Sequence, residues 1–70
     1  MPKMPGINHL DAVRAFQNAG FWILRQGKHT IMTDGTRKIV IPWHNPVNAM
    51  TMAGIIRDAG LSNEEFRKLV

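Results

Sequence analysis

The sequence contains no cysteine, no long apolar run and no glycine-rich phosphate loop. Without cysteine, the chain has no disulfide, no thiolate metal ligand and no thiol nucleophile. Its longest apolar runs are four residues, which is far too short to cross a membrane. Residues 1–6 also lack the apolar stretch of a signal peptide. These absences predict a soluble, cytoplasmic protein.

Acidic residues are scarce relative to basic ones. Nine Lys and Arg stand against five Asp and Glu, which gives a formal net charge of +4. Such an excess favours nucleic acid or another anionic partner, although the same charge also serves simple solvation. Neither a serine-nucleophile motif nor paired carboxylates are present, which argues against the enzymes that depend on them.

The chain of 70 residues is expected to form one small domain, with residues 1–7 as a flexible lead-in. A domain of this size buries only about 60% of the surface of its unfolded chain, so its core is thin. The apolar content of 44% is ordinary for a folded domain and too high for a disordered tail. Added stability is therefore expected from a partner subunit.

The first helix is predicted over residues 9–19. Asn8 is its cap, with Asp11 three residues later as in a capping box, and Gly20 provides the left-handed stop. His9 lies in the first turn, where we expect it to be solvated. The face expected to be buried carries residues at helical spacing: Leu10, Val13 and Phe16.

Three segments rich in branched and aromatic residues predict an antiparallel sheet: residues 21–26, 29–33 and 36–41. Gly27 permits a tight turn between the first two. The Asp34-Gly35 pair is a strong hairpin signal between the second and the third. Pro42 is expected to end the last strand because it has no N–H to donate.

Two registers of the second hairpin are compatible with the sequence. A two-residue loop pairs Ile31 with Lys38. A three-residue loop with a bulge pairs Ile31 with Ile39 and His29 with Ile41. The second is preferred because it places the apolar residues on a single face.

Two further helices are predicted after a loop at residues 43–48. The first of them is capped by Asn48 or Thr51 and stopped by Gly60, and Gly54 weakens it by roughly 1 kcal/mol unless close packing needs the missing side chain. Its apolar face has helical spacing: Met52, Ile55, Ile56 and Ala59. The last helix opens at a Ser62 capping box and is anchored by two apolar residues, Phe66 and Leu69. The order α-β-β-β-α-α predicts an α+β fold, with helices on one face of a three-stranded antiparallel sheet.

His29 stands out as a candidate for proton transfer. Its side chain titrates near neutrality, so it can take or give a proton at working pH. Cations near it in the sequence suit a phosphodiester, whose charge grows at the phosphorane: Arg25, Lys28, Arg37 and Lys38. Lys28 and Arg37 are the best candidates for stabilising that charge. The ordinary alternative is a strand histidine hydrogen-bonded at the edge of the sheet.

His44 is compatible with three roles: a second acid, a phosphate contact or a loop hydrogen bond. Trp22 and Trp43 are suited to stacking on bases, but in so small a chain they are more often core residues. A metal site of His29, His44 and Asp34 has no recognised ligand spacing, so no metal or other cofactor is expected.

Several stretches, taken in order, carry a resemblance to a known family: residues 19–21 (AGF), 25–29 (RQGKH), 40–44 (VIPWH), 51–61 (TMAGIIRDAGL) and 62–66 (SNEEF). With these stretches the chain resembles the HicA family of small toxins, the mRNA interferases of bacterial toxin-antitoxin pairs. The resemblance extends from about Leu10 to Leu69. The chain departs from the family at Lys28, where Ser or Gly is common, and at Met50-Thr51, where Gly-Thr often opens the helix.

The resemblance implies a fold like the double-stranded RNA-binding domain and a hydrolase that cleaves mRNA without a metal, with His29 as catalytic residue. Lys28 and His44 are candidates for catalytic support. Candidate RNA contacts are Arg25, Lys28, Arg37, Lys38 and Trp43. The implied partner is a HicB-like antitoxin, for which apolar residues near the hairpin are candidates: Trp43, Met50 and Met52.

Two alternatives stay open. One is a non-catalytic RNA-binding module with the same fold, and the other is an interaction protein whose basic face meets an acidic partner. Duplex RNA is disfavoured because the second helix carries only Arg57 against Asp58.

Overall fold

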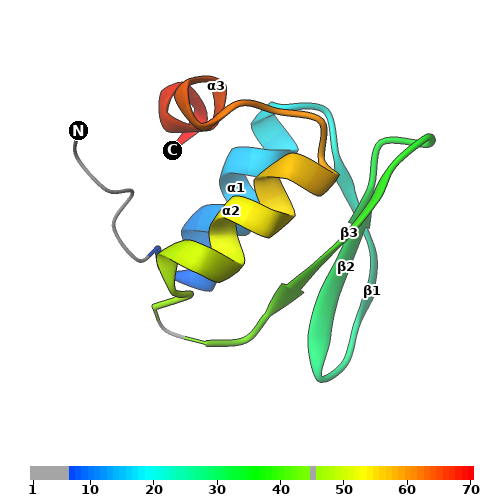
Figure 1. Ribbon diagram of the computed structural model, residues 1–70. Coiled ribbons are helices and arrows are strands. Elements are labelled where there is room, and N and C mark those ends of the chain that lie inside the picture. The colour runs from blue at the N-terminus through cyan, green and yellow to red at the C-terminus, as the bar shows by residue number, and fades with distance from the viewer. Residues whose placement is uncertain (1–6, 45) are drawn as a thin grey trace.

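The computed structural model describes residues 7–44 and 46–70. Three antiparallel strands form one open sheet, and α1 and α2 lie side by side on one of its faces (Figure 1). The elements follow the order α1 (His9–Asn18), β1 (Trp22–Gln26), β2 (His29–Thr33), β3 (Lys38–Pro42), α2 (Ala49–Asp58) and α3 (Asn63–Leu69). The predicted α+β class and element order are confirmed.

The predicted lead-in spans residues 1–7. Residues 1–6 lie outside the described part of the chain, but Ile7 belongs to the fold. Its backbone forms an isolated antiparallel bridge with Val47, in which each N–H donates to the other residue's carbonyl, at 3.1 and 2.7 Å. This bridge ties the entry to α1 to the entry to α2.

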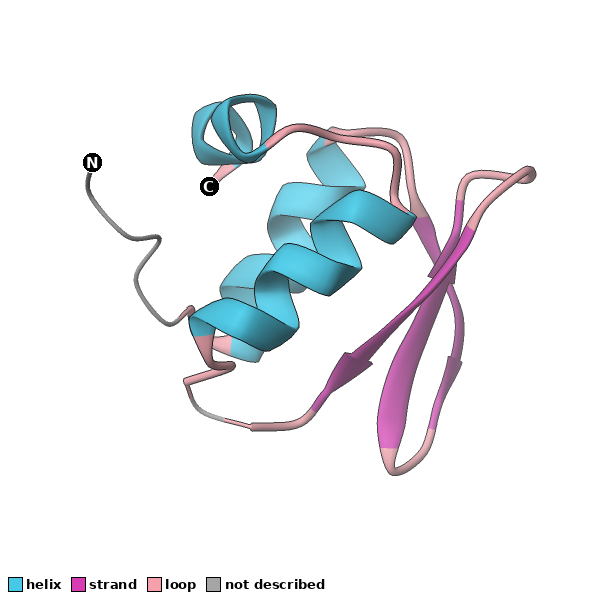
Figure 2. Cartoon of the chain, viewed as in Figure 1, coloured by secondary structure: helices cyan, strands magenta, loops and turns pink. Residues whose placement is uncertain are grey.

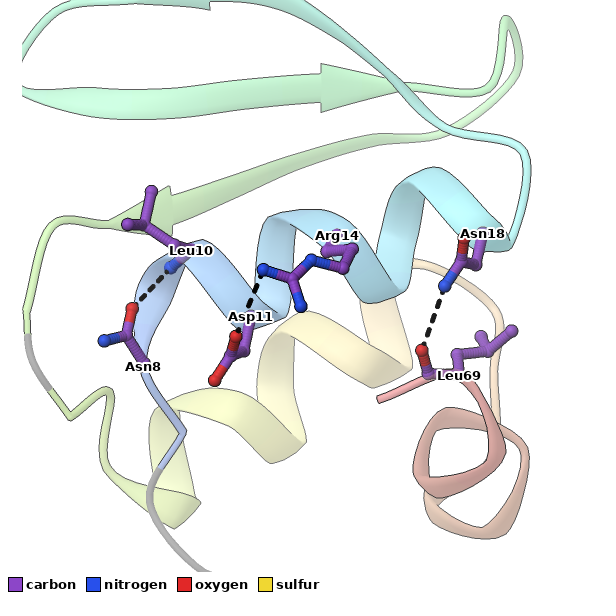
Figure 3. Close-up of polar contacts among 6 residues, drawn as sticks. All are labelled: Asn8, Leu10, Asp11, Arg14, Asn18 and Leu69. Carbon is purple, nitrogen blue, oxygen red and sulfur yellow. Dashed lines mark hydrogen bonds and ion pairs between the residues drawn. The ribbon is translucent and has the colours of Figure 1, made fainter.

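The start of α1 is fixed by Asn8. Its Oδ1 accepts from the backbone N–H of Leu10 at 2.8 Å (Figure 3), which satisfies one of the free donors of the first turn. Asp11 instead lies 3.7 Å from the Arg14 guanidinium in an exposed ion pair. Gly20 follows the helix at φ +99°, as the left-handed stop requires.

The prediction that Leu10 is buried is wrong. Leu10 is 61% exposed, whereas Ala12, Val13, Ala15 and Phe16 face the core. Leu10 lies in the first turn of α1, outside the set of residues that this helix buries.

The N-terminal caps of α2 and α3 are residues that the sequence predicts as caps. Asn48 accepts from the Thr51 N–H at 2.8 Å, which settles the choice between the two candidate caps. Ser62 and Glu65 form the predicted capping box, with both reciprocal hydrogen bonds present. The Ser62 N–H donates to the Glu65 carboxylate and lowers the pKa of that carboxyl.

One core connects the helices to the sheet. Its largest fully buried side chains are Phe16, Phe66, Met32, Ile39, Ile41, Met52 and Ile56. Phe16 lies at the centre, with ring centroids 5.8 Å from Phe21 and 5.1 Å from Phe66. The C-terminal helix is held to α1 at a second point, where Asn18 Nδ2 donates to the Leu69 carbonyl at 3.1 Å (Figure 3).

Both predicted registers of the β2–β3 hairpin are wrong. Ile31 pairs with Val40, His29 with Pro42 and Thr33 with Lys38, so the loop is four residues long, 34–37. Pro42 therefore belongs to β3 as its last residue. The preferred register assumed that apolar residues gather on one face, but Ile31 and Val40 share the face that carries no helix.

The four-residue loop is held by side chains. The Thr33 hydroxyl accepts from the Gly35 N–H at 3.0 Å and donates to the Arg37 carbonyl at 2.6 Å. The Asp34 carboxylate accepts from the N–H groups of Thr36 and Arg37 at 2.9 and 2.7 Å. Gly35 takes φ +95°, where a side chain would be strained.

The sheet extends beyond the helices that cover it. In Figure 2 α1 and α2 lie against β3, and β1 forms the edge far from them. Every residue of β1 is exposed. A bulge between Ile23 and Arg25 interrupts its pairing with β2. In the described part of the chain, no helix is long and apolar enough to span a membrane.

Candidate functional site

The sheet has two ends, which Figure 1 shows at opposite extremes of the hairpins. The His29 end consists of the end of β1, the turn at residues 27–28, the start of β2 and the end of β3. The turn end consists of residues 33–38, around the β2–β3 loop. The candidate residues are divided between these two ends.

A shallow depression of about 180 Å³ opens at the His29 end. It is lined by Arg25, Gly27, Lys28, His29 and Ile31. Four of these five residues belong to the stretch, 25–29, that suggested a site from the sequence. The predicted candidate His29 thus lies in a concave part of the surface with two of the predicted cations.

The strand alternation explains why His29 faces outward. Thr30 and Met32 are buried beneath the helices, so the alternate residues His29 and Ile31 face the opposite side of the sheet. His29 is exposed, and its strand partner is Pro42. Pro42 has no N–H, so it cannot donate a backbone hydrogen bond at this end of β3.

Two cations accompany His29. Arg25 pairs with Ile31 across β1 and β2 and so shares its face, and Lys28 directly precedes the histidine. Neither cation makes a hydrogen bond or ion pair with any other residue of 7–44 or 46–70. Their positive charge therefore stays available to an anion in the depression.

Gly27 keeps this depression open. Its φ is not in the left-handed region, and a Cβ built there meets nothing within 4 Å. The backbone of the turn therefore does not need glycine at this position. What the missing side chain provides is space beside Lys28 and His29.

The other two predicted cations are not part of this group. Lys38 pairs with Thr33, four residues along β2 from His29, which separates them by about 13 Å at a strand rise of ~3.3 Å per residue. Arg37 is further still. The expectation that Arg37 stabilises charge beside His29 does not fit this placement.

Arg37 packs against the loop after α2 instead. Its guanidinium lies so close to Gly60 that a Cβ on that glycine would be 2.7 Å from Nε. Gly60 also takes φ +78°, as expected for the stop of α2. Arg37 thus helps to join the β2–β3 turn to the end of the helix.

Asp34 is also engaged in the fold. The N–H of Arg37, followed by that of Thr36, lowers the pKa of the Asp34 carboxyl by hydrogen bonding to its ionised form. The metal site considered from His29, His44 and Asp34 is not assembled, because Asp34 and His29 lie at opposite ends of β2. Within residues 7–44 and 46–70 no group of three His, Asp or Glu is close enough to hold a metal ion.

His44 is exposed and follows β3 by two residues. Since Pro42 is the strand partner of His29, both histidines belong to the His29 end. This placement is compatible with the acid and the phosphate-contact roles. It assigns neither.

Both tryptophans are half exposed, and neither belongs to the core: Trp22 is 50% and Trp43 is 49% exposed. The expectation that they are core residues is wrong. Trp22 is paired with Thr33 and approaches Gly35, at the turn end. Trp43 lies at the His29 end, where its Nε1–H donates to the Thr30 hydroxyl at 2.8 Å.

His9 is a residue whose position the sequence did not indicate. Its ring lies nearly parallel to that of Trp43, with centroids 6.2 Å apart and an interplanar angle of 17°. The two residues are far apart in the chain and meet only because the N-terminus of α1 lies beside the end of β3. A residue expected to be simply solvated is therefore part of the His29 end.

No match to this chain was found among protein-family models, curated proteins or solved structures.

Proposed function

We propose that this protein is an endoribonuclease toxin of the HicA type that cleaves mRNA without a metal, with His29 as the catalytic residue. The observation that supports this most is the exposed imidazole of His29 in a depression that also holds Arg25, Lys28 and the open space at Gly27. An imidazole that can accept and donate a proton, together with unpaired cations, suits proton transfer at a phosphodiester.

In the proposed reaction, His29 removes the proton from a ribose 2′-OH. The 2′-oxygen forms a bond to the adjacent phosphorus, and the bond from phosphorus to the 5′-oxygen breaks. The leaving 5′-oxygen takes a proton, with His44 as the candidate donor. The products are a 2′,3′-cyclic phosphate and a 5′-OH end.

Charge on the phosphorane would be stabilised by Lys28 and Arg25. Lys28 replaces the Ser or Gly that is common in the HicA family, and its ammonium adds a positive charge next to the base. Arg25 is assigned the role first expected of Arg37, because Arg25 shares the outer face of the sheet with His29, whereas Arg37 is at the turn end.

A protein partner is part of this proposal. The face of the sheet that carries no helix exposes Trp22 and Val40 beside Arg25 and Lys38. A HicB-like antitoxin that covers this face would block the depression at His29. Of the apolar residues first expected to contact it, Met50 is 87% exposed, but Met52 is fully buried and unavailable.

The test is to incubate the purified protein with a long RNA in the presence of EDTA and to analyse the new ends. Cleavage that gives 2′,3′-cyclic phosphate and 5′-OH ends is the expected result. An intact RNA, or cleavage that stops with EDTA, contradicts the proposal. RNA that is bound but never cut would instead favour the non-catalytic RNA-binding module.

A further inference from the structure

A second depression, of about 220 Å³, lies at the His29 end on the side of the sheet that faces the helices. It lies between the first turns of α1 and the ends of β1 and β3. Its lining residues are His9, Leu10, Val13, Gln26, Thr30 and Trp43. None of the steps proposed at His29 uses it.

Two aromatic rings form part of this depression. The imidazole of His9 and the indole of Trp43 are nearly parallel, at an angle of 17°. The indole is held by its hydrogen bond to the Thr30 hydroxyl. Thr30 is only 2% exposed and belongs to the central strand, so Trp43 is anchored to a rigid part of the fold although half of its own surface faces solvent.

The remaining lining combines apolar and polar surface. Leu10 and Val13 contribute methyl groups from α1, and Gln26 contributes a carboxamide from the end of β1. A carboxamide has both donors and an acceptor, which is the pattern needed to meet the edge of a nucleobase. Flat aromatic faces stack on bases whatever their sequence.

We propose that this depression binds one unpaired nucleobase, stacked on Trp43 and lined by His9, with its edge at Gln26. The inference rests on the proposed function in that it names the part of the RNA that is bound beside the reacting phosphate. It also explains why an indole is kept half exposed and hydrogen-bonded, a placement that contributes little to the core.

The position of this base slot relative to His29 supports the inference. Neighbouring residues of the β1–β2 hairpin line the two depressions: Gln26 and Thr30 line the base slot, and Gly27 and His29 line the other. An RNA strand that passes around the β1–β2 turn can place a phosphate at Lys28 and a neighbouring base against Trp43. Unpaired RNA is the favoured ligand, because a base in a duplex must first be unstacked and unpaired before it can enter the slot.

The probe for the test is a short 2′-O-methyl oligonucleotide, which has no 2′-OH for the proposed reaction and so stays intact. A matched oligonucleotide with abasic sugars carries the same phosphates. The protein carries Trp22→Phe, so that its remaining indole fluorescence comes from Trp43. We expect the oligonucleotide with bases to quench this fluorescence and to bind more tightly than the abasic one.

The variant Trp43→Ala should weaken binding of the oligonucleotide with bases by about 5- to 150-fold, the usual contribution of one stacked base. Binding of the abasic oligonucleotide should not change. Trp22→Ala is the matched control, because Trp22 has the same exposure but lies at the turn end. Should Trp43→Ala fail to fold, His9→Leu removes one ring of the slot and leaves the Trp43–Thr30 hydrogen bond in place.

Equal affinity for the two oligonucleotides, or an equal loss with both on Trp43 substitution, would overturn the base slot. A protein that never cuts RNA but shows base-dependent quenching supports the slot while refuting the nuclease. Cleavage that proceeds with no base-dependent quenching supports the nuclease and overturns the slot.

Discussion

At the turn end of the sheet the polar side chains hold the backbone, whereas at the His29 end they face solvent. Thr33 and Asp34 together accept three backbone N–H groups, and the Thr33 hydroxyl also donates to the Arg37 carbonyl. The side chains of Arg25, Lys28 and His29 make no hydrogen bond or ion pair with the other residues in the described ranges. The two ends share residue types but differ in what those residues bind.

This difference shows that positive charge alone does not identify a ligand-binding site. Arg37 and Lys28 have the same charge and are both exposed, yet Arg37 lies against Gly60 and Lys28 borders a depression. A polar group that the fold already satisfies stabilises the fold. A group left unpaired beside a concavity is available to a ligand.

The largest expected effect is the loss of RNA cleavage in the variant His29→Ala. Loss of a general base typically costs about 10²–10⁴-fold in rate, and His29 is exposed, so its substitution should leave the fold intact. The measurement is single-turnover cleavage of a long RNA with EDTA present. His29→Gln is the matched variant, since it keeps polarity and size but cannot transfer the proton.

Both His29 variants should keep the circular dichroism spectrum and the affinity for a 2′-O-methyl oligonucleotide. A folded, RNA-binding His29→Ala protein that cuts at the wild-type rate would remove His29 from the mechanism. The same assay on His44→Ala then asks whether the second histidine of this end has the catalytic role.

The next largest effect is the difference in cleavage between variants of one lysine from each end of the sheet. Lys28→Ala should lower cleavage by about tenfold or more, because a hydrogen bond to a charged group is worth ~1.5–3 kcal/mol. Lys38→Ala should weaken binding and leave the rate of the bound complex unchanged, since Lys38 is four residues along the strand from the reacting group. If both variants slowed cleavage of bound RNA equally, the two ends of the sheet would not differ in their catalytic role.

The salt dependence of the RNA affinity tests how the charges at the two ends contribute to binding. If about three or four phosphates are contacted, the log–log slope of affinity against salt should be roughly −2 to −3 on single-stranded RNA. Each lysine that contacts a phosphate contributes about 0.7 to that slope. A slope near zero for the wild-type protein would contradict an electrostatic interface at either end.

Two buried threonines of β2 offer a smaller, paired test. Thr33→Val and Thr30→Val each remove a hydroxyl that is hydrogen-bonded, and each should cost about 1–3 kcal/mol in the free energy of unfolding by urea. Only Thr30→Val should also weaken binding of the oligonucleotide with bases, because Trp43 loses its anchor. If Thr33→Val weakens that binding equally, the loss does not come from the anchor of Trp43.

The smallest effect is expected at Gly54, which belongs to neither end. A Cβ there meets nothing within 4 Å, so Gly54→Ala should stabilise α2 by about 1 kcal/mol with no change in cleavage. Gly60→Ala should do the opposite, because of its positive φ and the close guanidinium of Arg37. Thermal unfolding of both variants measures this, and a destabilised Gly54→Ala would mean that packing requires the glycine.

Much of the fold could be predicted because its signals are local. Caps such as Asn48 and Ser62, the stop at Gly20 and the spacing of apolar residues in α2 are all read within one or two turns of chain. The register of β2–β3 could not be read this way. It depends on Thr33 and Asp34 satisfying the loop backbone, and on a sheet that leaves Ile31 and Val40 uncovered.

The candidate site was predictable in part for the same reason. His29, Lys28 and Arg25 are close in sequence, so a turn suffices to bring them together. The separation of Arg37 depends on its packing against Gly60, and the pairing of His9 with Trp43 depends on how α1 lies against the end of β3. These are long-range results of folding, with no local pattern to indicate them.

The measurement that tests the account most directly is a titration of ¹⁵N-labelled protein with the 2′-O-methyl oligonucleotide, followed by amide and indole resonances. The account predicts that the largest shifts fall on Gly27, Lys28, His29 and the Trp43 indole, while Gly35 and Thr36 at the turn end stay in place. Shifts concentrated on residues 34–37 with the His29 end unchanged, or no shifts at all, would contradict it.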